Sequence, residues 1–153
     1  MSATPAAHQV GPALELDLDA TFEAVSAAGR RLVPLLEQAF GEERGAVLRL
    51  GIVEAMTNVV EHGCAGREGG RLHLRVVSGP SQWCFTLTDN GRPIPDEAFR
   101  GADGTVFDFD PESRDQLPEG GMGLSLIRMA FDRVDYEVAA TGNRLLLSTH
   151  LGT

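Results

Sequence analysis

Positive charge is scarce in this sequence. Its 153 residues include 13 basic and 22 acidic side chains, for a formal net charge of −9, and the basic residues form no cluster. Nucleic-acid backbones reward clusters of Lys and Arg, so this charge balance argues against direct nucleic-acid binding. Long apolar runs are also missing, because no window approaches the roughly 18 consecutive apolar residues typical of a membrane-spanning helix. We therefore expect neither nucleic acid nor a membrane as a partner.

The sequence has few cysteines and shows no pattern of a secretory signal. Cys64 and Cys84 are the only two cysteines and show no metal-ligand spacing, so we expect free thiols in a reducing compartment. Residues 1–13 lack the basic start and the apolar run of a secretory signal and are interpreted as a flexible tail. These features predict a cytoplasmic protein in which residues 14–151 form a single domain.

The hydrophobic pattern predicts an α+β fold. Alternation over 14–18 indicates a strand, and helical periodicity indicates helices over about 21–40 and 42–62, the second ending at Gly63 in a left-handed cap. Strands over 71–77 and 82–88 form a hairpin, and a helix over 123–131 precedes a closing hairpin of residues 136–140 and 144–151. The expected architecture is a two-layer α/β sandwich, with a mixed, mostly antiparallel sheet covered by helices on one face.

The second predicted helix is strongly apolar but carries a polar line. Glu54 and Asn58 lie four residues apart and therefore on one side, and Glu61 and His62 extend the line. Spacing alone favours a solvent-facing stripe, and the alternative is the wall of a wet pocket. In that pocket the Asn58 carbonyl oxygen could bind Mg²⁺, and Glu54 could accept a proton from a hydroxyl nucleophile.

An acidic residue continues the core-facing side of the predicted strand 82–88. Asp89 falls in that position directly before Asn90 and Gly91. In isolation these residues favour a simple turn. The alternative is that the Asp89 carboxylate accepts a hydrogen bond from an exocyclic amine such as that of adenine, while Gly91 lets the backbone approach the ligand closely.

A glycine-rich segment, Gly120–Gly123, precedes Leu124, where helical periodicity returns. Glycines ahead of a helix leave N–H groups that can bind phosphate, although a flexible hinge explains them as well. Between residues 90 and 121 no periodicity is sustained, and a loop of this length commonly acts as a lid or binding segment.

The order and spacing of these pieces resemble the GHKL ATPases. Residues 54–63, EAMTNVVEHG, resemble their asparagine box, residues 89–94, DNGRPI, resemble the first glycine box, and residues 121–127, GMGLSLI, resemble the second. Within that superfamily, the first and third segments are most similar to the RsbW/SpoIIAB type of anti-sigma-factor serine/threonine kinase.

The resemblance implies the histidine-kinase-like ATPase fold with ATP and Mg²⁺ as cofactors. It assigns Mg²⁺ binding to Asn58, the general base to Glu54, and the ATP lid to residues 95–120. Nucleotide contacts fall to Asn58, Asp89, Gly91, Gly121, Gly123 and Leu124.

The implied activity is phosphorylation of a STAS-domain antagonist on Ser or Thr, combined with control of a sigma factor by partner switching. A homodimer is compatible with the resemblance. The alternative is a non-catalytic module of the same fold that regulates a partner by nucleotide-dependent association alone.

Overall fold

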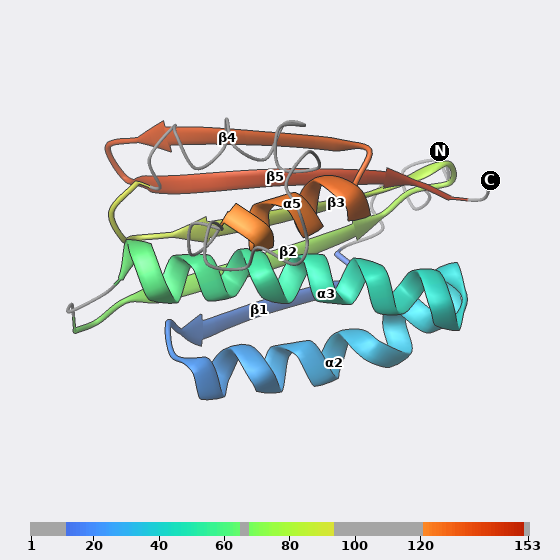
Figure 1. The fold of residues 1–153 in the computed structure, drawn as a ribbon, viewed down its shortest axis with the longest axis horizontal. Coiled ribbons are helices and arrows are strands. Elements are labelled where there is room, and N and C mark those ends of the chain that lie inside the picture. The colour runs from blue at the N-terminus through green and yellow to red at the C-terminus, as the bar shows by residue number, and fades with distance from the viewer. Residues whose placement is uncertain (1–11, 65–67, 94–120, 152–153) are drawn as a thin grey trace, which may run out of the picture.

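The computed structural model describes residues 12–64, 68–93 and 121–151, and in it a layer of helices lies against one face of a sheet (Figure 1). The predicted lid, 95–120, and residues 1–11 of the predicted tail lie outside the described residues. The elements in chain order are β1 (Leu14–Asp19), α2 (Phe22–Phe40), α3 (Glu42–Asn58), η1 (Val59–Gly63), β2 (Arg71–Ser78), β3 (Gln82–Asp89), α5 (Gly121–Ala130), β4 (Arg133–Ala139) and β5 (Gly142–His150). The predicted two-layer sandwich is confirmed.

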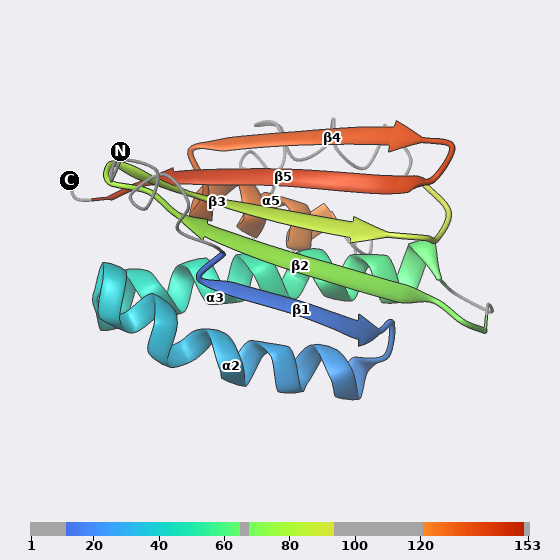
Figure 2. The same cartoon turned by 180° about the vertical axis from the view of Figure 1, so that it is seen from behind.

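The sheet has five strands in the order β1-β2-β3-β5-β4. Every pairing in the described part of the chain is antiparallel. The strand that comes last in sequence, β5, lies between β3 and β4, and it pairs with β3 from Gln82↔His150 to Asp89↔Asn143. Seen from behind in Figure 2, the other face of the sheet carries none of the helices of the described residues.

Local signals explain where α2 begins and ends. The Thr21 side chain caps its start by accepting a hydrogen bond from the Ala24 N–H at 3.1 Å. At the other end Gly41 has a φ of 89°, in the region that favours glycine, and its N–H donates to the Glu37 carbonyl. Pro34 lies inside the helix and removes one of its hydrogen bonds, and the ribbon changes direction in this half of α2 (Figure 1).

The core lies between the two layers. Gly51 lets α3 approach α5 closely, since a Cβ there would lie 3.0 Å from the Ala130 Cβ and from the Phe131 ring. The largest fully buried apolar side chains come from both layers: Leu32, Leu36, Leu48, Ile52, Met56, Leu72, Leu74, Val76, Phe85 and Ile127. Cys64 and Cys84 form no disulfide with each other. In the stretches that the structure describes, no helix combines the length and apolar character needed to cross a membrane.

The end of the second predicted helix differs from the expectation. Helix α3 stops at Asn58, and Val59–Gly63 form the π-helical turn η1, in which the Cys64 N–H donates to the Val59 carbonyl at 2.8 Å. Gly63 is not among the described glycines with positive φ, so the prediction of a left-handed cap there is wrong. Its missing side chain serves close packing instead, because a Cβ would lie 3.1 Å from the Arg92 carbonyl oxygen.

The edge strand β1 is tied to β2 by a histidine on the open face of the sheet. His73 Nδ1 lies 2.8 Å from Asp17 Oδ1, and its Nε2 lies 2.8 Å from Glu15 Oε2. The hydrogen bond to Asp17 raises the pKa of His73 above its ordinary value of 6.5, partial burial opposes the shift, and Glu15 reinforces it. When it is protonated, the ring can donate to both carboxylates and tie the edge strand to β2.

This arrangement predicts a pH-dependent stability. A pKa that is higher in the folded state gives a contribution that is fully present below pH 6.5 and is lost as the pH rises through the folded-state pKa. The free energy of unfolding of wild type relative to His73→Gln should therefore be larger at about pH 5.5 than at about pH 8.5, as measured by denaturant titration.

The control is His150→Gln, on the exposed end of β5, a strand that does not neighbour β1. It measures how much of the pH dependence follows from replacing a histidine outside the His73 cluster. Equal behaviour of the two variants would show that the His73 cluster does not couple protonation to folding.

Candidate functional site

Three of the four buried polar side chains of the described residues belong to chain segments that meet at one end of the molecule. Asn58 (4% exposed) ends α3, Asp89 (6%) ends β3, and Asn143 (2%) begins β5. In Figure 1 the end of α3, the end of β3 and the β4–β5 turn lie together at the left. The fourth, Thr149, lies at the other end of β5, where it accepts a hydrogen bond from Arg44 at 2.8 Å.

Asp89 is the last core-facing residue of β3, and its side chain is held by two donors. The Gly91 N–H donates to Asp89 Oδ1 at 2.8 Å, and Asn143 Nδ2 donates to the same oxygen at 3.0 Å. The first of these bonds closes the local turn that the sequence predicts. The burial goes beyond a simple turn, because a buried carboxylate is stable only when it is hydrogen-bonded. Asp89 is therefore a built acceptor on the helix side of the sheet.

Asn143 was not singled out by the sequence analysis. It pairs with Asp89 across β3 and β5, and its Nδ2 also donates to the Gly91 carbonyl at 2.9 Å. The signal was present in the sequence, since Asn143 begins the same alternating series as the core residues Leu145 and Leu147. Its position beside Gly142 favoured a turn interpretation instead.

Asn58 and Glu54 differ in their surroundings. Asn58 is buried, and its Nδ2 is the one buried side-chain nitrogen or oxygen atom of the described residues that has no hydrogen-bond partner. Glu54, one helical turn earlier, is half-buried, as is Glu61, while His62 is exposed. For Asn58 the solvent-facing interpretation is therefore wrong. A buried donor without a partner costs about 1–3 kcal/mol, which a ligand that accepts from this amide would recover.

Glycines allow the segments of the site to approach each other. A Cβ on Gly91 would lie 2.5 Å from the Gly63 carbonyl oxygen, and the Arg92 N–H donates to that oxygen at 2.7 Å. A Cβ on Gly142 would lie 2.5 Å from the Asp89 carbonyl oxygen. The end of β3 is thus packed between η1 and the start of β5, with no room for a side chain at either contact.

The glycine-rich segment lies partly inside a helix. Gly121, Gly123 and Leu124 fall in the first turn of α5, which begins two residues earlier than predicted. In Figure 1 this first turn is the end of α5 nearer to the end of β3. The helix N-terminus therefore faces the same end of the molecule as Asp89 and Asn58, as an N–H group that binds an anion would require.

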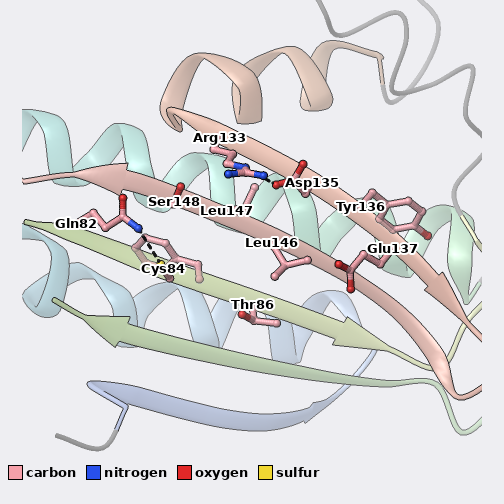
Figure 3. Close-up of a pocket in the computed structure, with 11 residues that line it drawn as sticks. Gln82, Cys84, Thr86, Arg133, Asp135, Tyr136, Glu137, Leu146, Leu147 and Ser148 are labelled. Atoms are coloured by element: carbon pink, nitrogen blue, oxygen red, sulfur yellow. Dashed lines mark hydrogen bonds and ion pairs between the residues drawn. The ribbon is translucent and has the colours of Figure 1, made fainter. Parts of the chain in front are cut away.

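A separate hollow of about 510 Å³ lies on the open face of the sheet (Figure 3). Its lining includes Cys84 and Thr86 from β3, and Arg133 and Asp135 from β4. Arg133 and Asp135 form an ion pair at 2.6 Å. Strand alternation places Asp89 and Asn143 on the opposite face, so this hollow is not part of the candidate site.

The family described as "Histidine kinase-like ATPase domain" matches residues 18–149. The serine-protein kinase RsbW of Halalkalibacterium halodurans is 34% identical over 88 residues, which cover 58% of this chain and 52% of that protein. The chain thus spans about half the length of this curated relative.

Two solved structures share the fold. The histidine kinase domain of a blue-light activated histidine kinase from Erythrobacter litoralis superposes with a TM-score of 0.53 at 18% identity, covering 83% of this chain and 61% of that one. The RsbU and RsbW domains of a Mycobacterium tuberculosis protein give 0.57 at 19% identity, covering 92% of this chain and 33% of that one. At these identities the likeness concerns the fold.

The unpartnered amide makes a prediction about stability without any ligand. Asn58→Leu keeps the shape of the side chain but removes the buried donor, so the free energy of unfolding should rise by about 1–2 kcal/mol. Denaturant unfolding followed by the fluorescence of the buried Trp83 measures this.

The matched control is Asn90→Leu. Asn90 accepts from the Arg71 N–H at 2.8 Å and donates to the Gly69 carbonyl at 3.1 Å, so its replacement should lower the stability. A loss for Asn58→Leu as large as that for Asn90→Leu would mean that the Asn58 amide is satisfied in solution.

Proposed function

The chain belongs to the family of histidine kinase-like ATPase domains, and from this premise we propose that it is an ATP-dependent protein serine/threonine kinase of the anti-sigma-factor type. The observation that carries the proposal is the buried, unpartnered amide of Asn58, one helical turn from Glu54. The likeness to a serine-protein kinase named RsbW supports the choice of a protein hydroxyl as the acceptor.

Nucleotide recognition is assigned to the end of β3. The Asp89 carboxylate would accept a hydrogen bond from the exocyclic amine of adenine, and its burial strengthens such a bond. Gly91 holds the turn after Asp89 through its N–H, and its backbone would lie close to the base. Gly121, Gly123 and Leu124 would contribute the first turn of α5, whose N–H groups suit phosphate oxygens.

The Asn58 side chain fits the metal and phosphate end of the ligand. An amide offers a carbonyl oxygen, the type of ligand that Mg²⁺ prefers, and an N–H donor that suits a phosphate oxygen. The desolvation cost of the unpartnered Nδ2 would be recovered there. Bound Mg²⁺ supplies positive charge that offsets the charge of the transferring phosphoryl group.

Glu54 is the proposed general base. It is half-buried and thus open on one side to a partner protein. In the proposed step the hydroxyl oxygen of a partner Ser or Thr bonds to the γ-phosphorus, the bond to the β–γ bridging oxygen breaks, and ADP leaves with its electron pair. Glu54 takes the proton of the hydroxyl group. The rest of the catalysis is positioning and charge stabilisation by the binding residues.

The proposed partners are a STAS-domain antagonist, which receives the phosphate, and a sigma factor, which is bound in one state and released in another. A protein that binds two partners in alternation needs two states with different affinities, and nucleotide binding supplies them. Regulation by nucleotide-dependent association alone would need Asp89 and Asn58 but not Glu54. A variant of Glu54 therefore distinguishes this mode from regulation by phosphorylation.

The first test is a thermal shift. Millimolar Mg-ATP at about 100 times its Kd stabilises by about 2.7 kcal/mol, which corresponds to a rise in Tm of roughly 5–10 °C for a domain of this size. Asp89→Asn and Asn58→Ala should each lose the shift while remaining folded. If the Tm of wild type does not rise at any ATP concentration, the proposed nucleotide binding is wrong, and the proposed kinase activity is wrong with it.

The second test concerns transfer. With labelled ATP and a STAS-domain antagonist, Glu54→Gln should lose phosphorylation of the antagonist and keep the Mg-ATP thermal shift. Glu43→Gln makes the same change in the first turn of α3, at the far end of the helix, and should phosphorylate normally. A normal rate of phosphorylation by Glu54→Gln would contradict the assignment of Glu54 as the general base. If wild type transfers no phosphate but keeps the Mg-ATP thermal shift, the chain acts as the non-catalytic binding module.

A further inference from the structure

Asn143 closes a ring of hydrogen bonds around the turn after β3. Its Nδ2 has two hydrogens, and both are used: one goes to Asp89 Oδ1 at 3.0 Å and the other to the Gly91 carbonyl at 2.9 Å. The Gly91 N–H completes the ring by donating to Asp89 Oδ1 at 2.8 Å. The ring connects β5 to β3 through side chains, in addition to the ladder between the strands.

Both donors reach the same oxygen of the carboxylate. Oδ1 is engaged twice, so the rotation of the carboxylate is fixed and Oδ2 is left to meet a ligand. Without Asn143 a single backbone N–H would hold the carboxylate, and its plane could turn. Only 2% of the Asn143 surface is exposed, so a ligand could hardly touch this side chain directly. Asn143 therefore acts through Asp89.

We propose that Asn143 is the positioning residue that makes Asp89 discriminate a 6-aminopurine from a 6-oxopurine nucleotide; this rests on the proposed nucleotide site. A fixed carboxylate oxygen is an acceptor only. It pairs with the amino group at position 6 of adenine and opposes the carbonyl oxygen at position 6 of hypoxanthine. A carboxylate that can turn away from the carbonyl oxygen opposes it less, so specificity depends on the orientation that Asn143 imposes.

The other buried polar residue of β5 offers a contrast within the same strand. Thr149 also faces the helix layer and is 1% exposed, but its partner is Arg44 at the far end of the sheet. Removing its hydroxyl group takes away a partly buried hydrogen bond of the same strand without touching Asp89. A variant of Thr149 therefore distinguishes a loss of stability from a loss of the Asp89 carboxylate orientation.

The experiment compares the Kd values of ATP and inosine triphosphate, which differ at position 6 of the purine, for wild type, Asn143→Leu and Thr149→Val. Wild type should prefer ATP roughly 100-fold. In Asn143→Leu the preference should fall below roughly tenfold, mainly through weaker ATP binding, because the side chain keeps its shape but cannot donate. Thr149→Val should keep the wild-type preference even though its Tm falls.

The outcomes separate the two levels of the argument. If Asn143→Leu weakens both nucleotides equally and the preference stays near 100-fold, Asn143 is only structural and the inference is overturned, while nucleotide binding stands. If wild type binds neither nucleotide, the proposed function fails and the inference fails with it. If the leucine variant does not fold, the ratio of the two Kd values is measured with Asn143→Ala instead. The alanine side chain also removes the donor, and the space that it leaves admits water.

Discussion

A hydrogen bond of 3.0 Å between Asn143 and Asp89 joins β5 to the central strand β3 at the end where the candidate site lies. Burying either side chain alone would cost several kcal/mol of desolvation free energy. The hydrogen bond between them offsets this cost for both residues. The strand pairing that builds the sheet therefore also builds the acceptor of the candidate site. The order β3-β5 is a requirement of the site as well as of the fold.

Close approach of backbone segments sets the second constraint. Gly91 against Gly63, and Gly142 against Asp89, leave no room for a Cβ, so three chain segments far apart in sequence are held in contact. Asn58 ends α3 directly before the π-helical turn that carries Gly63 to this contact. π-helical turns inside helices are frequent at functional sites, where they redirect side chains. Within the described residues Asp89 Oδ1 has two donors, from Gly91 and Asn143, whereas the buried Nδ2 of Asn58 has no hydrogen-bond partner.

The sequence predicted the elements well because alternation and helical periodicity are local properties. Strand β3 was expected at 82–88 and runs Gln82–Asp89, and the same alternation placed Asp89 toward the core. Local patterns could not show the π-helical turn, where the Cys64 N–H donates to the Val59 carbonyl, or the place of β5 between β3 and β4. Spacing could not decide the burial of Asn58 either, because it depends on what packs against the helix. The roles of Glu54, Asn58 and Asp89 stay predictions, and the lid at 95–120 lies outside the described residues.

The position of β5 between β3 and β4 has a consequence for the synthesis of the protein. Asp89 leaves the ribosome 54 residues before its partner Asn143, and until β5 inserts between β3 and β4 the acceptor at the end of β3 lacks one of its two donors. Pairing over such a separation is slow compared with local hairpin formation. A nascent chain made only as far as β3 therefore lacks the bond between Asn143 and Asp89, and the candidate site is completed in a late step of synthesis.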